Sequence, residues 1–575
     1  MELPAPLADR LARLAPDQRS AATAPPGPLL CVAPAGSGKT TTLVARVAWL
    51  IASGAASPDE IAAITFNSRA AQELRERLTS ALEPLGVAAA AVRVRTFHAL
   101  GLEILRDSGE VVEPLVSRMA ILRQVAPAAG RVGWRTLDTA ISRLKLDLGV
   151  TADEVATDQE AGPTARAFVD YQRAVAATGG LDFDDLVART LALLSSSPAI
   201  LARWRRRCGH LLVDEAQDLD RAQLRLALLL AAPSNRVFFV GDDDQSIYGW
   251  RLADVRRVLS LADSLPGLRR VDLVVNYRCP PTVVARAVRL VEHNRERFAK
   301  TIRAGPAAAG AIVLARDSAD ETQRIGRVVD SWPDDGATRA ILARTNRELL
   351  PAIAVCLDRR LRFRPPAIEL LVTSPHVDAA IDEASRTTDR ELPLPARLEA
   401  VRARWAIRPA AATTADTEGL DDGESDAPTP LEVARALVAW SVPFAALDGL
   451  RAAVAERRAA LAELCRDDAP LTLATAHGTK GLEFDHVAVI GMDAGRFPSR
   501  RSVAESAEPG RALEEERRLA YVAWTRACRS LTLVYDPLAP SAFMLEAFTA
   551  EELGVEPDAV AAAAAATNSP SADAD

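Results

Sequence analysis

A glycine-rich segment near the start of the chain has the composition of a loop that binds phosphate. The segment VAPAGSGKTTTL (32–43) follows the apolar run LLCVA (29–33) and opens a stretch of helical period. Strand, loop and helix in this order form the context that a phosphate-binding loop requires. Gly36 and Gly38 let backbone N–H groups approach phosphate, and the helix N-terminus adds positive potential. We therefore expect a triphosphate to bind here.

Two side chains at the end of this loop suit a nucleoside triphosphate with its metal ion. Lys39 is expected to reach the β- and γ-phosphates, and the Thr40 hydroxyl to ligate Mg²⁺. The strict pattern has glycine where this chain has Ala33, and a plain glycine-rich turn is the alternative for this segment alone. The loop residues expected around the nucleotide are Ala33, Pro34, Ala35, Gly36, Ser37, Gly38, Lys39, Thr40 and Thr41.

Two acidic segments follow later apolar runs. In VDEAQD (213–218), Asp214 suits a metal ligand that acts through water, and Glu215 suits the base that orients an attacking water. Such a pair alone is more often a helix cap or a solvated turn. The segment VGDDDQSIYGWR (240–251) adds acids, a glutamine and two aromatic rings. Together with the glycine-rich loop, these segments indicate a nucleoside triphosphatase.

The elements that must position these residues alternate along the chain. Short apolar runs are followed by helix-length amphipathic segments, which is typical of a parallel α/β fold. The predicted strands form two sets, one at 29–33, 61–66, 210–215 and 236–241, the other at 340–344, 471–477, 486–491 and 531–536. Each set combines distant parts of the chain, so the sequence predicts two α/β domains with insertions.

Length, charge and cysteine content set broader limits. The chain has 575 residues, which corresponds to about four domains, and a formal net charge of −8. Thirteen of its acids lie in two segments without lysine or arginine, 410–430 and 541–575, and the rest is mildly basic. The six cysteines contain no CxxC pair, which argues against a disulfide framework or a cysteine-bound metal. Without a signal peptide or a membrane-length apolar run, we expect a cytoplasmic protein.

Lysine is rare in this chain. Only four of the 69 basic residues are lysine, namely Lys39, Lys145, Lys300 and Lys480. A GC-rich genome that favours arginine codons accounts for the bias, yet a lysine that persists suggests a need for a compact ammonium. Two of the four lie in motifs, and chance is the simplest explanation for Lys145 and Lys300.

The chain resembles superfamily 1 helicases of the UvrD/Rep/PcrA group between about Leu14 and Asp536. The resemblance rests on the three segments above and on eight further motifs in the group's order. They are PDQRSAA (16–22), ITFNSRAAQELRERL (64–78), RTFHALG (95–101), LDFDDL (181–186), VVNYR (274–278), ARTN (343–346), TAHGTKGLEFDHV (475–487) and EEERRLAYVAWTRA (514–527).

The resemblance implies a fold of two RecA-like parallel-sheet domains. Domain 1A would comprise 1–97 and 204–272, with the helical domain 1B at 98–203. Domain 2A would comprise 273–365 and 469–545, with a reduced 2B-type insertion at 366–468 that contains an acidic loop. An acidic, disordered tail is expected at 546–575.

The resemblance also assigns roles in ATP hydrolysis. Gln18 would read adenine, Tyr277 would stack on it, and Glu483 would meet the ribose. Gln245 resembles the glutamine that senses the γ-phosphate, and Lys480 belongs to the coupling loop around Glu483. Arg278 and Arg526 resemble two arginine fingers, both expected in the second α/β domain, so hydrolysis would require both domains. The catalytic residues implied are Lys39, Glu215, Gln245, Arg278 and Arg526, and the metal would be held at Thr40 and Asp214.

The same resemblance implies contacts with single-stranded DNA. Bases can stack on aromatic rings irrespective of their sequence. The alternative for each ring is that it is buried in the hydrophobic core. Arg69, Asn346 and Arg344 are weaker candidates, for contacts with the DNA backbone. The residues expected to contact DNA are Phe66, Arg69, His98, Tyr248, Trp250, Asn346 and His477.

Four departures from the group limit this inference, and the first is Ala33 in the phosphate loop. Thr41 replaces an arginine that commonly covers adenine, and Trp524 replaces a smaller residue. The insertion at 366–468 is shorter than the group's 2B domain, which regulates unwinding. The expectation is an ATP- and Mg²⁺-dependent DNA helicase that moves 3′-to-5′ on single strands and on 3′-tailed duplexes, in DNA repair or replication.

Two other functions remain alternatives. One is a translocase subunit of a repair or defence complex, which needs a partner protein to open duplex. The other is a catalytically silent DNA-binding protein, which predicts loss of hydrolysis residues that are all present here. The chemistry of the contacts leaves RNA open as a substrate.

Overall fold

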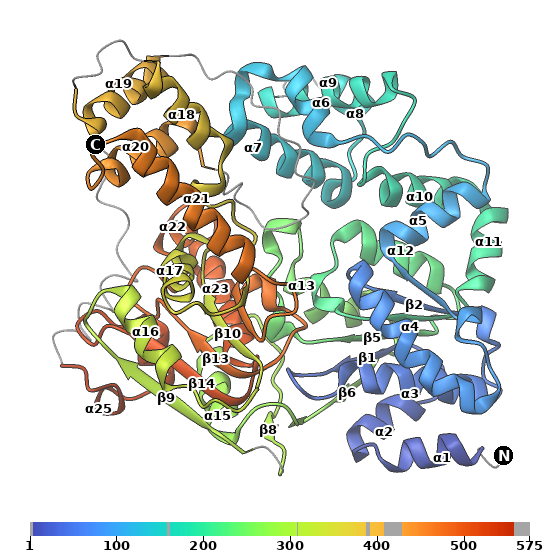
Figure 1. Cartoon of the computed structure of the whole chain (residues 1–575). Coiled ribbons are helices and arrows are strands. Elements are labelled where there is room, and N and C mark those ends of the chain that lie inside the picture. The colour runs from blue at the N-terminus through green and yellow to red at the C-terminus, as the bar shows by residue number, and fades with distance from the viewer. Residues whose placement is uncertain (1–3, 158–161, 307–308, 387–391, 408–427, 557–575) are drawn as a thin grey trace. The chain divides into compact units, whose positions relative to one another are not determined.

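The computed structural model describes residues 4–157, 162–306, 309–386, 392–407 and 428–556 (Figure 1). The chain forms two compact units. The first comprises residues 1–278 and 294–307, and the second comprises 279–293 and 308–575. The polypeptide therefore passes between the units three times, and the segment 294–307 returns to the first unit.

The first unit is built on a six-stranded parallel sheet in the order β3-β2-β4-β5-β1-β6. Alternate residues of its strands serve two cores, as expected for a sheet covered on both faces. Leu29 and Cys31 face a core with α3 and α4, whereas Leu30 and Val32 face a core with α5, α10 and α12. The strands are β1 (Leu29–Val32), β2 (Ile61–Thr65), β3 (Arg93–Thr96), β4 (His210–Val213), β5 (Val237–Gly241) and β6 (Arg269–Asp272).

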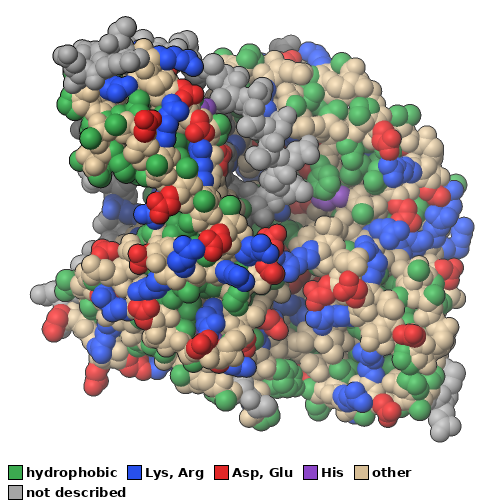
Figure 2. Space-filling view, in the orientation of Figure 1, with side chains coloured by type: hydrophobic (Ala, Val, Ile, Leu, Met, Phe, Trp, Pro, Cys, Tyr) green, Lys and Arg blue, Asp and Glu red, His purple; other side chains and the backbone are tan. Residues whose placement is uncertain are grey.

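Helices flank this sheet and fill the segment between β3 and β4. The flanking helices are α1 (Ala5–Ala12), α2 (Pro16–Thr23), α3 (Lys39–Ala52), α4 (Ser68–Leu82), α12 (Arg221–Ala231), α13 (Val255–Leu259) and α14 (Leu261–Ser264). Between β3 and β4 lie α5 (Phe97–Asp107), α6 (Arg118–Val125), α7 (Gly130–Ser142), the π-helix η5 (Arg143–Leu148), α8 (Ala152–Thr157), α9 (Pro163–Ala177), α10 (Asp185–Ser196) and α11 (Pro198–Arg207). Helices α6 to α9 share a separate core around Phe168. Basic side chains gather on the surface over α11 (Figure 2).

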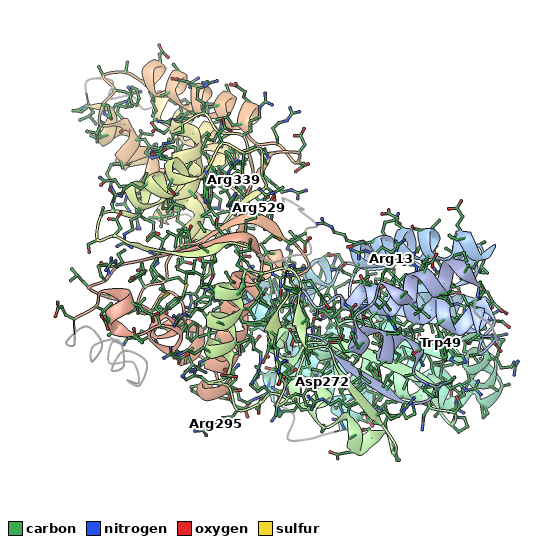
Figure 3. All side chains as sticks on the ribbon, turned by 90° about the horizontal axis from the view of Figure 1, so that it is seen from below. Arg13, Trp49, Asp272, Arg295, Arg339 and Arg529 are labelled. Atoms are coloured by element: carbon green, nitrogen blue, oxygen red, sulfur yellow. The ribbon has the colours of Figure 1, made fainter. Side chains whose placement is uncertain are left out.

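The second unit contains another six-stranded parallel sheet, in the order β11-β12-β10-β13-β14-β9. Its strands are β9 (Ala311–Arg316), β10 (Arg339–Ala343), β11 (Phe363–Arg364), β12 (Leu471–Thr475), β13 (Phe484–Val489) and β14 (Ala527–Tyr535). The Asp335 carboxylate forms ion pairs with the guanidinium groups of Arg339 over 3.0 Å and of Arg529 over 3.2 Å. These pairs connect the start of β10, at Arg339, to β14, which contains Arg529 (Figure 3). The main helices of the second unit are α15 (Pro281–Val291), α16 (Glu321–Ser331), α17 (Leu350–Asp358), α22 (Arg500–Ala504), α23 (Pro509–Trp524), α24 (Ala542–Ala547) and α25 (Ala550–Leu553).

The insertion between β11 and β12 has a small helical core. It contains α18 (Pro375–Ser385), α19 (Leu394–Ile407), α20 (Pro430–Ser441) and α21 (Leu447–Leu464). Val377, Leu398, Leu437 and Leu450, one from each helix, are buried together. The described part of this segment therefore buries its own apolar surface. The expected acidic loop falls almost entirely in 408–427, outside the described residues.

The predicted α/β class with two parallel sheets is confirmed, and all eight predicted strands are present. The sequence missed β3, β6, β9 and β11, and also the short pair β7 (Val275–Asn276) and β8 (Arg303–Ala304). That pair lies in the first unit, whereas the sequence placed 273–365 in the second domain. The strand β8 follows the return of the chain from α15, and this return has no apolar signature.

The expectation of a disordered tail from residue 546 is wrong for residues 546–556. Phe548 and Leu553 are buried, and the Tyr535 hydroxyl donates to the carbonyl of Leu553 over 2.8 Å. Trp524, the unusual large residue, is buried with its ring centroid 6.2 Å from that of Phe548. Apolar side chains therefore hold this segment despite its acids. Residues 557–575 lie outside the description.

No single helix among the described residues is long and apolar enough to cross a membrane. Helices α10 and α11 together meet the length and composition test, but they are bent by 114° at their junction.

Candidate functional site

The glycine-rich loop of the first unit lies between β1 and α3 as predicted. Gly36 and Gly38 have φ of +67° and +83°, which favour glycine. A Cβ at Gly36 would come within 2.7 Å of the Asn276 side chain, and one at Gly38 within 2.6 Å of Gln18. Both glycines are thus required by backbone conformation and by the close approach of neighbouring side chains.

Gln18 lies against this loop, as its predicted role requires. Its Nε2 donates to the carbonyl of Ser37 over 2.8 Å, and its Oε1 accepts from the Ala15 N–H at the start of α2. The neighbouring Asp17 accepts from the backbone N–H of Val274 over 2.9 Å. These bonds fix the beginning of α2 beside the loop.

Lys39 and Thr40 begin α3 at the end of the loop. The Lys39 ammonium donates to the carbonyl of Ala33 over 3.2 Å, which folds the side chain back over the loop. The Ala33 N–H donates to the carbonyl of Gly241 over 2.8 Å, so alanine at this position is held by the adjacent strand β5. A compact ammonium and a hydroxyl therefore occupy the same helix N-terminus, where backbone N–H groups favour anions.

The paired carboxylates lie at the end of β4. Glu215 has φ of +51°, a left-handed conformation that is uncommon for a residue other than glycine. Gln217 holds its carboxylate with a hydrogen bond of 2.6 Å from Nε2. The Oε1 of the same Gln217 accepts from the Asp242 N–H over 3.0 Å. Gln217 thus joins Glu215 to the acidic loop after β5, a role that the sequence did not reveal.

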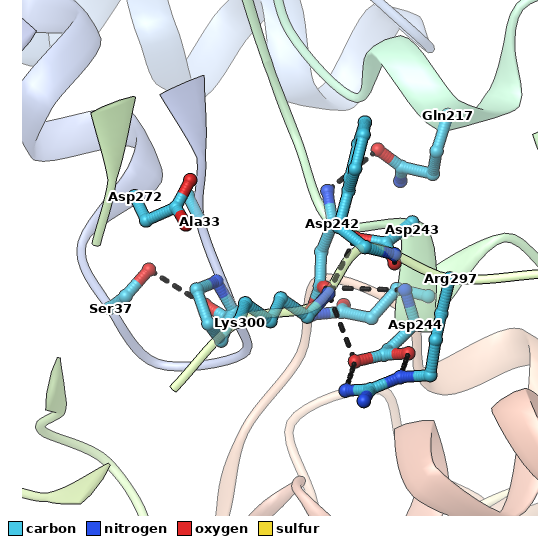
Figure 4. Close-up of polar contacts among 12 residues, drawn as sticks. Ala33, Ser37, Gln217, Asp242, Asp243, Asp244, Asp272, Arg297 and Lys300 are labelled. Carbon is cyan, nitrogen blue, oxygen red and sulfur yellow. Dashed lines mark hydrogen bonds and ion pairs between the residues drawn. The ribbon is translucent and has the colours of Figure 1, made fainter. Parts of the chain in front are cut away.

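The loop after β5 is buried and densely hydrogen-bonded (Figure 4). Gln245 donates from Nε2 to Asp242 Oδ2 over 2.8 Å. Burial alone would raise the pKa of Asp242, but the ammonium groups of Lys300 and Lys39 hold that pKa below its ordinary value. Glu215, Gln217, Asp242 and Gln245 therefore form one continuous network, with Lys39 close enough to act on its charge.

Tyr277 and Arg278 lie in the first unit, which corrects the expectation that Arg278 belongs to the second. The Tyr277 N–H donates to the carbonyl of Gly36 over 2.9 Å, and the Arg278 N–H to Asn276 Oδ1 over 2.9 Å. A Cβ at Gly36 would also lie 2.7 Å from the Arg278 Cβ. The ring of Tyr277 is 49% exposed, as a platform for a base would be.

The remaining residues predicted for nucleotide lie in the second unit. Arg526 is buried, and its guanidinium donates to the carbonyls of Val522 over 2.8 Å and of Leu482 over 3.1 Å. The Phe484 N–H donates to the carbonyl of Arg526 over 3.0 Å. Arg526 and the exposed Glu483 are therefore neighbours within this unit.

An aromatic surface lies beside the acidic loop of the first unit. Phe66 stacks on Tyr248 with ring centroids 4.9 Å apart and 11° between the planes. Trp250 meets Tyr248 edge-on at 6.2 Å, and the guanidinium of Arg251 lies 4.4 Å from its ring centroid. Trp250 is 39% exposed. The structure therefore brings three of the predicted DNA contacts together, with a cation beside them.

His98 is less open than expected, and Phe183 supplies the exposed ring instead. The two rings stack at 3.9 Å and 19°, and Phe183 is 52% exposed. Burial lowers the pKa of His98 to about 4, so the imidazole is neutral at pH 7. Phe66 and His98 line a small cavity together with Asp214. Phe183 lies in the motif LDFDDL and could have been noted as an aromatic residue between acids.

The other predicted DNA contacts are Arg69 in the first unit and Asn346 and His477 in the second unit. Arg69 is exposed at the start of α4. In the second unit, Asn346 is half-buried and donates to the carbonyl of Ala367 over 3.4 Å. Burial, followed by the charges of Arg344 and Lys480, lowers the pKa of His477 to about 3. Arg344 itself pairs with Glu516 over 2.7 Å.

The residues predicted to hold Mg²⁺ suit that ion. Among the described residues, no three histidine, cysteine or acidic side chains are arranged to hold a metal by themselves. Magnesium at nucleotide sites uses one or two protein oxygens together with phosphates and water. Thr40 and Asp214 offer a hydroxyl and a carboxylate of that kind. Bound there, the ion would neutralise charge on the β- and γ-phosphates.

Comparison with known proteins gives a consistent result. Residues 14–266 match the UvrD/REP helicase N-terminal domain, and residues 457–537 match the UvrD-like helicase C-terminal domain. The ATP-dependent DNA helicase UvrD1 of Mycobacterium tuberculosis is 31% identical over 650 residues, covering 92% of this chain and 83% of the relative. DNA helicase II of Escherichia coli is 29% identical over 615 residues, covering 90% of this chain and 84% of the relative. The ATP-dependent DNA helicase PcrA of Staphylococcus aureus is 34% identical over 298 residues, covering 49% of this chain and 40% of the relative.

Proposed function

Because this chain belongs to the UvrD/Rep/PcrA group of superfamily 1 helicases and is an ATP-dependent DNA helicase, we propose that it moves 3′-to-5′ along single-stranded DNA. Its proposed function is to unwind 3′-tailed duplexes in DNA repair or replication. The energy would come from ATP hydrolysed at the loop of residues 33–40, with Mg²⁺ at Thr40 and Asp214.

The network of Glu215, Gln217, Asp242 and Gln245 is the observation that carries this proposal. Hydrolysis needs a base that orients water and a group that senses the γ-phosphate. Glu215 and Gln245 suit these roles, and Gln217 and Asp242 connect them through bonds of 2.6, 3.0 and 2.8 Å. A change at one of the two residues can therefore reach the other without passing through solvent.

The predicted adenine and finger residues support the same site to different degrees. Gln18 and Tyr277 are bonded to the loop that would hold the phosphates. Arg278 follows directly after Tyr277 and can supply a guanidinium to a transferring phosphoryl group. Arg526 belongs to the second unit, and its function as a second finger stays a prediction. Replacing either arginine with alanine should lower kcat about 10³-fold or more, because each guanidinium group would stabilise the negative charge of the transition state.

The aromatic surface supports binding of single strands. Bases can stack on Trp250 and Phe183 irrespective of sequence, and each stack contributes about 1–3 kcal/mol. The stacked pair of Phe66 and Tyr248 joins this surface to the acidic loop that contains Gln245. DNA bound on the rings would therefore contact the same loop that participates in hydrolysis.

Substitution of Lys39 tests the enzymatic part of the proposal. Lys39→Ala removes the ammonium that would neutralise the β- and γ-phosphates, so DNA-stimulated ATP hydrolysis should fall about 10²- to 10³-fold. The rate is measured by phosphate release with saturating oligonucleotide. Arg77→Ala, at an exposed ion pair on α4, serves as the matched loss of a cation and should change little. A Lys39→Ala protein with full activity would refute the proposed site.

Polarity requires a separate measurement. Purified chain should open a 3′-tailed duplex and leave a 5′-tailed duplex closed, with ATP hydrolysis measured in parallel. The small insertion of α18 to α21 favours a second candidate, a single-strand translocase that needs a partner to separate duplex. That alternative predicts directional displacement of streptavidin from a biotinylated single strand, but duplex opening only after addition of cell extract.

A further inference from the structure

Lys300, which the sequence assigned no role, is buried in the first unit. It lies on the segment 294–307, which returns from α15 of the second unit. Its ammonium lies 2.8 Å from Asp242 and 2.9 Å from Asp244, and it also pairs with Asp243 (Figure 4). The side chain is 1% exposed, and all three carboxylates are fully buried. One lysine thus contacts three consecutive acids of the loop that contains Gln245.

Asp242 connects this lysine to the hydrolysis residues. Its Oδ1 accepts from Lys300, and its Oδ2 accepts from Gln245 Nε2 over 2.8 Å. Its backbone N–H donates to Gln217, which binds Glu215. The two carboxylate oxygens of Asp242 therefore have different partners, so a rotation of Asp242 away from Lys300 would also displace Gln245.

Two further contacts fix the returning segment to the loop. Arg297 forms a two-point pair with Asp244, with distances of 3.0 and 2.9 Å. The Phe298 N–H donates to Asp243 over 2.8 Å. Residues 297–300 thus contact each of the three acids. Burial alone would lower the pKa of Lys300, but the three carboxylates raise that pKa above its ordinary value and keep the ammonium charged.

We propose that Lys300 is a positioning residue for ATP hydrolysis, which acts through Asp242 to orient Gln245 and Glu215. This inference rests on the proposed function. An ammonium is compact and has three rotatable donors, which suits three converging carboxylates, whereas a planar guanidinium does not. Only six residues separate Lys300 from the point where the chain leaves the second unit, so displacement of α15 would reach the hydrolysis loop through a short, anchored segment.

Two substitutions separate positioning from simple charge balance. Lys300→Met leaves three buried carboxylates without their common partner and is expected to lower Tm. The double variant Lys300→Met, Asp243→Asn removes one positive and one negative charge, and the Asp243 side chain still accepts from the Phe298 N–H of the returning segment. Burial, with the adjacent carboxylates, raises the pKa of Asp243, so a neutral side chain is tolerated there. The double variant should recover most of the lost Tm.

The kinetic readout decides between the two roles. With saturating single-stranded DNA, the double variant should keep a KM for ATP within about threefold of wild type, but its kcat should fall at least tenfold. Lys300→Arg should show the same loss. The matched control, Lys145→Met, removes a buried lysine that pairs with Asp182 and Asp185 instead, and it should lower Tm without a tenfold change in kcat of the folded protein.

Each outcome has a distinct meaning. Recovery of kcat together with Tm in the double variant, or wild-type kcat in Lys300→Arg, would overturn the positioning role. The Lys39→Ala protein is measured in the same series. Loss of DNA-stimulated hydrolysis in Lys39→Ala with normal kcat in the Lys300 variants would refute this inference alone. Full activity of Lys39→Ala would refute the proposed function itself.

Discussion

The first unit contains two buried lysine clusters that differ in what they hold together. Lys300 and Arg297 bind Asp242, Asp243 and Asp244, three neighbours in one loop. Lys145 and Arg118 instead bind the acids of a helical insertion, namely Asp138, Asp182, Asp184 and Asp185. The first cluster fixes a loop beside the proposed nucleotide site, and the second ties helices to one another.

Both clusters contain more carboxylates than cations, and the pKa values of their carboxylates shift in the same pattern. Burial, opposed by Lys300, raises the pKa of Asp243, and burial, opposed by Lys145, raises that of Asp185. In contrast, cations outweigh burial at Asp242 and Asp182 and lower the pKa of each. Each buried lysine thus holds one carboxylate ionised while a neighbour becomes easier to protonate. The difference between the clusters therefore lies in their neighbours: one touches Gln245, whereas the other touches Tyr171.

The largest effect that would sharpen this comparison is expected from Lys145→Met. Lys145 lies 2.7 Å from both Asp182 and Asp185, and removal of one partner of a buried ion pair costs about 3–5 kcal/mol. Urea unfolding followed by circular dichroism should show this loss. A change below about 1 kcal/mol would contradict the structural role of this cluster and weaken the contrast with Lys300.

A smaller effect is expected from Tyr171→Phe. The Tyr171 hydroxyl donates to Asp182 Oδ2 over 2.7 Å in the core of α6 to α9. A hydrogen bond to a charged group contributes about 1.5–3 kcal/mol, so unfolding stability should fall by that amount. Tyr535→Phe is the matched control, because that buried hydroxyl in the second unit donates to the neutral carbonyl of Leu553 over 2.8 Å. Equal losses in both variants would show that the bond to Asp182 is not special.

The two clusters also show what a sequence can reveal. Apolar periodicity predicts all eight inner strands of the two six-stranded sheets, because strands covered on both faces need continuous hydrophobic runs. It misses β3 and β6, whose residues RVRT and RRVD lie at the edges of the sheet. Residue types and spacing predict the phosphate loop and Glu215, because local chemistry requires them, and the resemblance adds Gln245. The partners Gln217 and Lys300 depend on contacts between distant segments.

The scarce lysines show the same limit. Lys145 and Lys300 lie outside the motifs, so residue types and spacing predict no role for either. Their role becomes visible only when residues 37 and 58 positions away are brought into contact, with Asp182 and Asp242 respectively. Arg278 was assigned to the wrong unit for the same reason, because β8 returns to β7 only after α15 has joined the second unit.

The smallest expected effect concerns Asp220, which lies beside the Lys145 cluster and caps α12. Its carboxylate accepts from the Gln223 N–H over 2.8 Å. Burial, with the charge of Asp184 adding to it, raises the pKa of Asp220 to about 7. Between pH 4 and pH 7 the folded protein therefore binds a proton that the unfolded chain releases, so this group makes the protein less stable as pH rises through that window.

Asp220→Asn should remove this pH dependence. Asparagine retains the cap but carries no charge, so the variant should gain about 1–2 kcal/mol more over wild type at pH 8 than at pH 5. Urea unfolding at both pH values measures the difference, and Asp320→Asn, at an exposed cap on α16, is the matched control. A gain that is equal at the two pH values would mean that Asp220 shares the cations of the neighbouring cluster and is ionised throughout. Such a result would remove the distinction between carboxylates that the buried lysines hold ionised and those that they do not reach.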